Sequence, residues 1–379
     1  MYEGLTPLLM GIIILLASLI SLRFGISVAI LEIIFGVVAG NLGLISPEGW
    51  MLYLSSFGGI FLTFLAGAET DIELMRREFK KSFLIGLFSF LTPFISVFLF
   101  TYYIANWNLL ASLIAGVALS GTAVAVVYFV LIENNIVQTD VGKRLMAANF
   151  VTNMGTALAL SILFLKPTFY TLIYISVSIM VIILATKFSN KVFENPRLKN
   201  KVIEPEIKYI FLLLLVFMFL AALGGGQAIL PAFVLGLFMS KHFVETIETI
   251  EVKKRLKTIA FAFITPVFFI VGGLNVSISL IYSMLPLFLS LFVVRQLSKF
   301  AGVYLITRKY LQKDQLYTTL LLSTGLTFGL IACLFGLNSS YINQIQYSIL
   351  TGVLIASAII PTYIAQKWFM PLHPEDMVS

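Results

Sequence analysis

The chain has 379 residues, of which 59% are hydrophobic and 11% are charged, and its mean hydropathy is +1.01. A soluble domain carries about 25% charged residues, so this composition excludes a soluble enzyme and indicates a polytopic helical membrane protein. The net charge of +7 comes from short loops, so nucleic-acid binding is not expected. Cys333 is the single cysteine, and His242 and His373 lie outside apolar segments, which excludes an intrachain disulfide and argues against a cysteine or histidine metal site.

Apolar segments recur along the whole chain and predict an all-α fold with thirteen membrane-spanning helices. An odd number with an extra central helix predicts two repeats, 1–165 and 208–379, joined by a linker helix and cytoplasmic loop at 166–207. The repeats are then oppositely oriented, as in many secondary transporters. The predicted spans are 5–22, 26–44, 51–67, 82–105, 109–132, 144–165, 169–187, 208–224, 226–240, 258–274, 280–306, 316–337 and 344–366.

The basic residues predict the orientation of the chain in the membrane. Of the 25 Lys and Arg residues, 22 fall in loops on one side, Lys166 falls on the other, and two lie inside a span. The positive-inside rule therefore predicts an N-terminus outside and a C-terminus in the cytoplasm. Only Glu3 precedes the first span as a charged residue, so we interpret that span as a retained helix and not as a cleaved signal.

Small residues interrupt the fifth span of each repeat. The first break has the sequence LSGTA at 119–123, and the second has STGLT at 323–327. A break frees backbone groups, which in lipid must face protein, water or an ion. Glycines also allow membrane helices to pack closely, which explains either break alone. Their matching positions in the two repeats instead favour the binding site of a secondary transporter.

Three charged residues lie in the interior of predicted spans, away from their ends. Arg295 and Lys299 are four residues apart in 280–306 and therefore share one helix face, and Glu32 lies in the second span. Each charge costs about 2.5–3.5 kcal/mol on insertion scales, which makes it a functional candidate. The depth of Arg295 requires a partner or a wet cavity, whereas Lys299 has the alternative of snorkelling to the cytoplasmic interface.

The sixth span carries a polar group near its middle. Thr152, Asn153 and Thr156 fall near the bilayer midplane, and Asn149 lies one turn before Asn153. Taken alone, these residues are also explained by hydrogen bonds between packed helices.

Several motifs in chain order are similar to one known family. The chain resembles the monovalent cation/proton antiporter superfamily, in particular the branch with Kef-type potassium/proton and NapA-type sodium/proton antiporters. The resemblance covers nearly the whole chain. The motifs are ILEIIFG at 30–36 with AGNLG at 39–43, FLAGAETD at 64–71, ALSGTAV at 118–124, PAFVLG at 231–236, PVFF at 266–269 with Gly272, and GLTFG at 325–329.

The resemblance implies a homodimer in the cytoplasmic membrane of a prokaryote. Each protomer would have a core domain, with helices at about 82–165 and 280–337, in which the two broken helices cross near the midplane. The remaining helices would form a dimerisation domain. The implied activity is exchange of sodium or potassium for protons by alternating access, with no cofactor.

The resemblance also assigns candidate site residues. The family's ion- and proton-binding carboxylate occurs in an Asp-Asp, Asn-Asp or similar pair, which falls on Thr152 and Asn153 in this sequence. Thr122, Thr327 and Ser120 from the broken helices would complete a site for a monovalent cation only. The family's basic partner falls on Arg295, with Lys299 one turn on. Secondary candidates for carrying the proton are Glu32, Glu69 and Asp71.

Position 153 departs from the family pattern, because an aspartate is expected there. An asparagine stays neutral and cannot exchange a proton for a cation. We favour an engineered substitution that mimics the protonated carboxyl and traps one state, because the surrounding sequence keeps the antiporter pattern. The alternatives are a natural site rebuilt from Thr152, Thr122, Asn153 and backbone carbonyls, or a protein that has abandoned cation exchange.

The same substitution leaves two other functions open. A transporter of anionic solutes fits Arg295 and Lys299, which have no matching acid apart from Glu32, and the positive ends of broken helices also favour anions. A channel or cation sensor that uses this fold without exchange is the third hypothesis. A parent with one aspartate at 153 would exchange one proton per cation and so be electroneutral.

Overall fold

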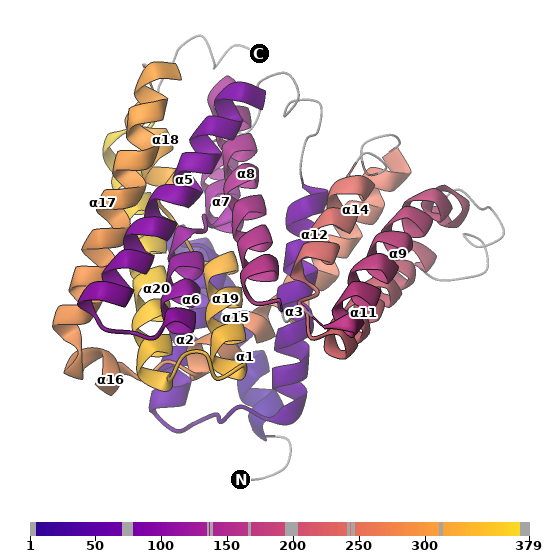
Figure 1. Ribbon diagram of the computed structural model, residues 1–379, viewed down its shortest axis with the longest axis horizontal. Helices are drawn as coiled ribbons and strands as arrows, with labels where there is room; N and C mark the ends of the chain where they lie inside the picture. Colours follow the sequence, from indigo (N-terminus) through magenta and orange to yellow (C-terminus); the bar gives the residue numbers. More distant parts are fainter. Residues whose placement is uncertain are drawn as a thin grey trace. The chain divides into compact units, whose positions relative to one another are not determined.

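The structure is a computed structural model that describes residues 5–69, 79–134, 136, 139–165, 168–193, 204–240, 243, 247–310 and 314–371 (Figure 1). The elements assigned in these ranges are all helices. They are α1 (Leu5–Phe24), α2 (Val28–Asn41), α3 (Gly49–Ala68), α5 (Phe79–Leu99) with a π-helical end (Phe100–Ile104), α6 (Leu109–Ser120), α7 (Val124–Glu133), α8 (Asp140–Leu163), α9 (Phe169–Phe193), α11 (Pro205–Gly224), α12 (Ile229–Met239), α14 (Ile247–Ile259) with a π-helical turn (Ala260–Ile264), α15 (Thr265–Leu274), α16 (Ile278–Ser283), α17 (Leu285–Tyr310), α18 (Gln315–Leu322), α19 (Thr327–Asn338) and α20 (Gln344–Trp368).

The polytopic helical fold predicted from hydropathy is confirmed. In the described part of the chain, ten helical segments are long and apolar enough to cross a membrane, and α2, α6 and α12 are shorter apolar helices. Together they match the thirteen predicted spans. The weakest hydropathy boundary, the glycine run after α11, is a true helix end, because Gly225 has a φ of 62°, a left-handed conformation that favours glycine.

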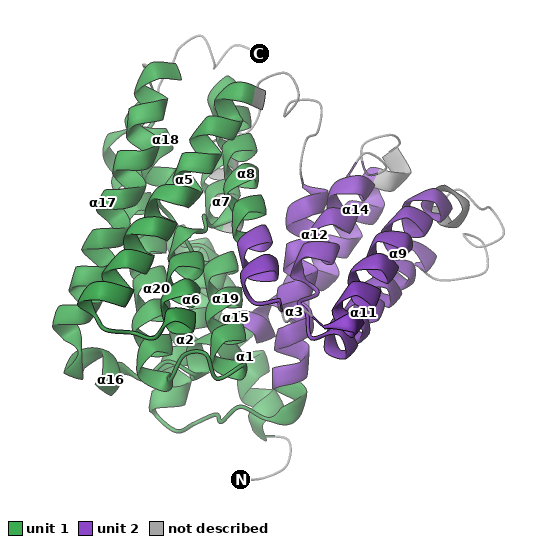
Figure 2. Cartoon of the chain, viewed as in Figure 1, with its two compact units in different colours: residues 1–51, 73–156, 269–379 green, residues 52–72, 157–268 purple. Residues whose placement is uncertain are grey.

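The chain divides into two compact units, coloured separately in Figure 2. Unit 1 comprises residues 1–51, 73–156 and 269–379, and unit 2 comprises residues 52–72 and 157–268. Each unit draws on distant parts of the sequence, so neither corresponds to one sequence repeat.

Unit 1 is built around α17 and α5, which pack along one another, with α6 on α5 and α19 on α6 (Figure 1). Its helices also approach by direct backbone contact. A Cβ at Gly36 in α2 would collide with the carbonyl of Ile270 in α15, and one at Gly273 would collide with the carbonyl of Ile33. The glycines therefore allow α2 and α15 to touch along their backbones, which is typical of membrane helices.

Unit 2 has its own apolar core between α3, α9, α11, α12 and α14, in which Phe61, Phe64 and Phe217 are almost completely buried. The turn that joins α11 to α12 is tied to α9 by two hydrogen bonds. Thr171 Oγ1 donates to Gly224 O at 2.8 Å, and Tyr174 Oη donates to Gln227 O at 2.7 Å. These bonds fix the glycine turn, where the freed carbonyls need donors.

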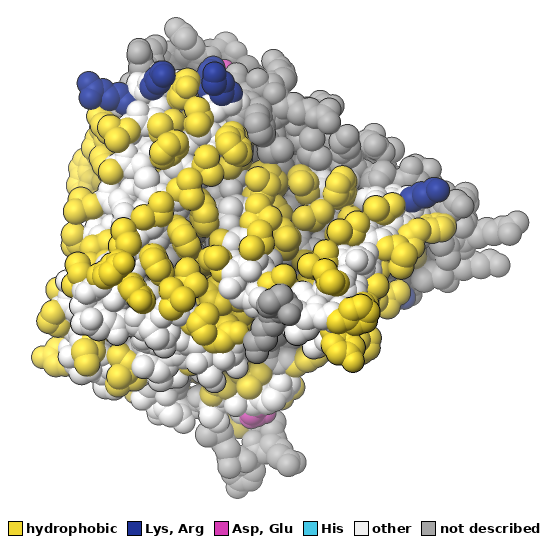
Figure 3. Space-filling view, in the orientation of Figure 1, with side chains coloured by type: hydrophobic (Ala, Val, Ile, Leu, Met, Phe, Trp, Pro, Cys, Tyr) yellow, Lys and Arg dark blue, Asp and Glu magenta, His cyan; other side chains and the backbone are white. Residues whose placement is uncertain are grey.

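The surface of unit 1 matches the expected membrane environment. Hydrophobic side chains cover its visible flank, and Lys and Arg gather at one end, where α5 and α8 begin and α17 finishes (Figures 1 and 3). Large apolar side chains such as Leu8, Leu22 and Leu305 are more than half exposed. The clustering of basic residues at one end of unit 1 agrees with the loop pattern in the sequence; which end faces the cytoplasm remains a prediction.

Candidate functional site

The two breaks predicted from sequence are present and meet each other within unit 1. Helix α6 ends at Ser120 and α7 begins at Val124, while α18 ends at Leu322 and α19 begins at Thr327. Ala123 N donates to Thr324 O at 3.3 Å, and Thr122 Oγ1 donates to Leu322 O at 3.1 Å. Backbone groups freed by each break thus find partners in the other break, as the membrane requires.

Small residues allow the helices at the crossing to approach. A Cβ at Gly329 would lie 2.6 Å from Ala118 O, and one at Gly121 would lie 3.4 Å from the Cβ of Phe328. A Cβ at Gly325 would meet the Arg295 guanidinium and would lie 3.0 Å from Gly121 O. Side chains at 325 and 329 would therefore separate the two broken helices.

Asn153 lies beside this crossing on α8 and is almost completely buried. Its Oδ1 accepts a hydrogen bond from Thr122 N at 3.3 Å, and its Nδ2 donates to Asn149 Oδ1 at 2.8 Å. Asn153 therefore contacts the first break directly, as the predicted site requires. Both ends of its amide are used, one as an acceptor and one as a donor.

Lys299 and Arg295 approach the crossing from α17, and both are completely buried. Lys299 Nζ donates to Ser89 Oγ and to Thr122 Oγ1, each at 2.9 Å. Arg295 Nη1 donates to Ser323 O at 2.7 Å. The alternative that Lys299 snorkels to the interface is therefore wrong, because its ammonium points inward to two hydroxyl groups.

Two of the other predicted ion ligands, Thr152 and Ser120, donate their hydroxyl groups to backbone carbonyls. Thr152 Oγ1 donates to Ala148 O at 3.0 Å and to Gly86 O of α5 at 3.1 Å. Ser120 Oγ donates to Val117 O at 2.8 Å in α6, and Thr327 is the first residue of α19. The described contacts thus join Thr122, Asn153, Arg295 and Lys299, whereas the hydroxyl groups of Thr152 and Ser120 bond elsewhere.

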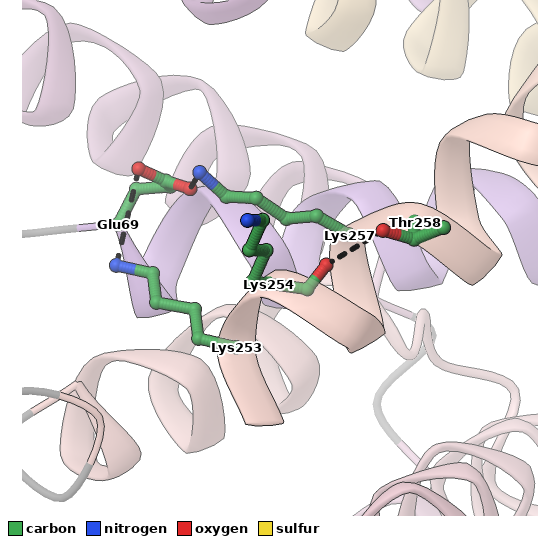
Figure 4. A network of polar contacts seen from close by, with 5 residues as sticks. All are labelled: Glu69, Lys253, Lys254, Lys257 and Thr258. Atoms are coloured by element: carbon green, nitrogen blue, oxygen red, sulfur yellow. Dashed lines mark hydrogen bonds and ion pairs between the residues drawn. The ribbon is translucent and has the colours of Figure 1, made fainter. Parts of the chain in front are cut away.

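Of the three secondary acidic candidates, the structure describes Glu32 and Glu69. Glu32 is buried in α2, with 3% of its surface exposed, and Asp71 lies outside the described residues. Glu69 follows α3 in unit 2 and forms ion pairs with two lysines of α14, Lys253 at 3.9 Å and Lys257 (Figure 4). Glu69 is therefore engaged as the shared partner of two ammonium groups.

Two residues of the site were missed in the sequence. Ser89 of α5 holds the Lys299 ammonium, and Ser357 Oγ of α20 lies 3.3 Å from Gly325 O, to which it donates. A single serine in an apolar helix is common, and only the packing of α5 and α20 gives these two their partners.

Comparisons with known proteins agree with this architecture. The family model described as "Sodium/hydrogen exchanger, transmembrane" matches residues 11–369. The chain is 28% identical to a protein of Methanocaldococcus jannaschii named "Probable Na(+)/H(+) antiporter 3", with 93% of each chain covered. It is 27% identical to the "Na(+)/H(+) antiporter" of Enterococcus hirae, with 93% of this chain and 94% of that protein covered.

A solved structure gives the fold. The sodium proton antiporter MjNhaP1 from Methanocaldococcus jannaschii, determined at pH 8, superposes with a TM-score of 0.69 at 18% identity and covers 96% of this chain and 98% of its own. The match of the family model over residues 11–369 confirms the family resemblance drawn from the motifs, and the family is one of transporters and not of enzymes. The chain belongs to the sodium/hydrogen exchanger family.

Proposed function

We propose that this chain is a secondary active antiporter that exchanges sodium or potassium for protons by alternating access. Support comes from the family match and from relatives named as Na⁺/H⁺ antiporters, one of which, GerN of Bacillus cereus, is named an Na⁺/H⁺-K⁺ antiporter. The observation that carries the proposal is the crossing of two broken helices beside Asn153. Discontinuous helices that meet in this way supply carbonyls for cations in secondary transporters.

In this proposal the cation site is formed by position 153, Thr122, Thr152, Thr327 and Ser120 together with backbone carbonyls of the breaks. Site residues from different helices would rearrange when the core domain moves. The Arg295 and Lys299 cations would balance a carboxylate at 153 when the ion leaves.

Asn153 replaces the aspartate of a parent protein in this proposal, as an engineered substitution. The surrounding sequence, which keeps the antiporter pattern, supports the substitution. The hydrogen bonding of Asn153 supports the trapped state, since Nδ2 donates to Asn149 Oδ1 at 2.8 Å. A protonated carboxyl makes the same pair of bonds, one as acceptor and one as donor, whereas an ionised carboxylate accepts only. The chain as it stands would therefore rest in the protonated-like state and exchange poorly.

The proposal places two copies of the chain side by side in a prokaryotic cytoplasmic membrane, with the N-terminus outside and the C-terminus in the cytoplasm. Two inverted repeats, 1–165 and 208–379, would flank the linker at 166–207. The core helices at about 82–165 and 280–337 would move against the dimerisation helices, carrying the crossing from one side to the other.

The test is proton exchange in proteoliposomes that contain a lumenal pH dye. The chain and its Asn153→Asp variant are compared on addition of sodium, potassium or lithium, with empty liposomes as the control. We expect cation-dependent dequenching from the variant and little from the chain itself. If neither protein responds to any cation, the antiporter proposal fails.

One observation favours a second candidate, a transporter of anionic solutes. Both buried cations donate to neutral groups, Ser89, Thr122 and Ser323. Anion-dependent uptake by the chain, with no cation-dependent proton flux from the Asn153→Asp variant, would support this candidate. Cation uptake without proton counter-transport, at channel-like rates, would instead indicate a non-exchanging channel.

A further inference from the structure

Unit 1 holds two buried basic side chains next to one another. Arg295 and Lys299 are one turn apart on α17, and each has 0% of its surface exposed. The ion pairs found among the described residues involve neither of them. Their acceptors are hydroxyl groups and a backbone carbonyl. A buried charge that lacks a counter-charge costs several kcal/mol, so the pair favours any ligand that brings a negative charge.

The same region contains buried hydrogen-bond donors that have no acceptor. Nε and Nη2 of Arg295 are buried and have no hydrogen-bond partner, and the same holds for Nδ2 of Asn149. Nη2 points into the second break, because a Cβ at Gly325 would collide with it. A buried donor with no acceptor carries an uncompensated desolvation penalty, and a guanidinium is well suited to bind an anion by two parallel N–H groups.

Helix α19 begins just beyond this break and adds positive potential. It has twelve residues, and its N-cap, Leu326, offers no side-chain cap. The first amides of an α-helix have no acceptor within the helix, and the helix dipole concentrates positive charge there. A buried guanidinium and an uncapped helix start thus lie at one place, and both attract anions.

We propose that Arg295 and the start of α19 bind a small monovalent inorganic anion, such as chloride, which supplies the negative charge that Asn153 lacks. Lys299 contributes charge but keeps its bonds to Ser89 and Thr122. The anion is small because Gly325 and Gly121 approach closely at the break. This site does not depend on the proposed cation exchange, since it concerns equilibrium binding to the chain as it stands.

The site predicts competition between the anion and a carboxylate at position 153. Asn153 accepts from Thr122 N, and the Thr122 hydroxyl accepts from Lys299. In an Asn153→Asp variant, the carboxylate would be linked to Lys299 through Thr122. Its negative charge would compensate Lys299 and Arg295 in place of the anion. Repulsion between two anions in a low-dielectric site is strong. We therefore expect the chloride affinity of the Asn153→Asp variant to be at least about tenfold lower than that of the unaltered chain.

The experiment measures binding of ³⁶Cl⁻ to the purified full chain in a non-ionic detergent. Gluconate replaces chloride at constant ionic strength and constant cation, and the midpoint of thermal unfolding is followed in the same solutions. We expect saturable binding and a saturable rise of the midpoint, since a ligand that binds only the folded state stabilises it. Arg295→Gln should abolish both effects.

Arg308→Gln is the matched control, because Arg308 is an exposed arginine in the last turn of the same helix, and it should leave chloride binding unchanged. Saturable binding of equal strength in Arg295→Gln, or no saturable binding to the chain, overturns the proposal. If Arg295→Gln does not fold, Asn153→Asp decides, and unchanged affinity in that variant overturns it. Absence of cation-dependent proton exchange from the Asn153→Asp variant, with chloride binding to the unaltered chain intact, would count against the antiporter proposal alone.

Discussion

At the scale of single residues, the hydrogen bonds of Asn153 explain what an aspartate at this position would need. An ionised carboxylate could keep the bond from Thr122 N but would repel Asn149 Oδ1, which now accepts from Asn153 Nδ2. Asn149 Nδ2 is buried and has no partner. Rotation of the Asn149 amide would turn this donor to the carboxylate, so Asn149 is poised to serve either protonation state.

Thr122 links the buried ammonium of Lys299 to the second break, so its loss should destabilise the protein. In Thr122→Ala, Lys299 Nζ loses one of its two acceptors and Leu322 O loses its donor. We expect a lower midpoint of thermal unfolding in detergent, with a cost of about 1–3 kcal/mol, and recovery in Thr122→Ser.

Thr186→Ala is the control for this prediction, because the Thr186 hydroxyl donates to Ile182 O and Ile183 O within α9. Replacing a hydroxyl that bonds within its own helix by alanine has little effect on the free energy of unfolding. Equal midpoints for Thr122→Ala and Thr186→Ala would contradict the bridging role of Thr122.

The sequence predicts some of this site and not the rest. Arg295 and Lys299 are identifiable because charged groups are costly in lipid and therefore stand out. Asn153 and Thr122 are assigned to the site by the family resemblance, and the glycine break at Thr122 supports that assignment. Ser89 does not stand out, since it contacts Lys299 across 210 residues of sequence. The orientation of Thr152 toward Gly86 O also depends on how α5 packs, which a local pattern does not encode.

At the scale of elements, the broken helices depend on glycine at the point of contact. A Cβ at Gly325 would press on the Arg295 guanidinium and on Gly121 O. We expect Gly325→Ala to lower the unfolding midpoint, with a cost of about 1–3 kcal/mol from overpacking, and to reduce exchange in the Asn153→Asp background.

Gly11→Ala in α1 is the matched control, because a Cβ there would meet nothing within 4 Å. Alanine is the better helix former by about 1 kcal/mol, so this variant should be neutral or slightly stabilised. A Gly325→Ala protein as stable as Gly11→Ala would contradict the close crossing.

The helix boundaries themselves were largely predictable. Hydropathy predicts the thirteen segments because the backbone of each must satisfy its hydrogen bonds within a helix in lipid. The breaks at 121–123 and 323–326 are predicted by their small residues. The π-helical turns at Phe100–Ile104 and Ala260–Ile264 have no sequence signal of this kind, since tertiary packing decides such insertions.

At the scale of the whole molecule, the predicted orientation can be tested by cysteine labelling. Cys333 is completely buried, so a single introduced cysteine reports its own exposure. With a membrane-impermeant maleimide on intact cells, we expect Ser46→Cys to react and Lys367→Cys to react only after permeabilisation. The unaltered chain is the control for background labelling. The opposite labelling pattern would contradict the predicted orientation and indicate an N-terminus in the cytoplasm.

The division into two units was not predictable from the linear order of spans. Unit 1 takes residues 1–51 and 269–379 together with 73–156, so its membership follows contacts between distant segments. Hydropathy reports the exposure of each helix to lipid, but it carries no information about which helices pack together.

The most direct test of the central claim, that residue 153 decides whether protons and cations compete, is proton release on cation binding. Sodium or potassium is added to purified protein in weakly buffered detergent solution, and the pH change is recorded for the chain and for Asn153→Asp. The variant should release up to roughly one proton per cation bound, by linkage, and its cation affinity should fall as pH is lowered. The chain should release none. Equal release from both proteins would place the titrating group elsewhere and contradict the account.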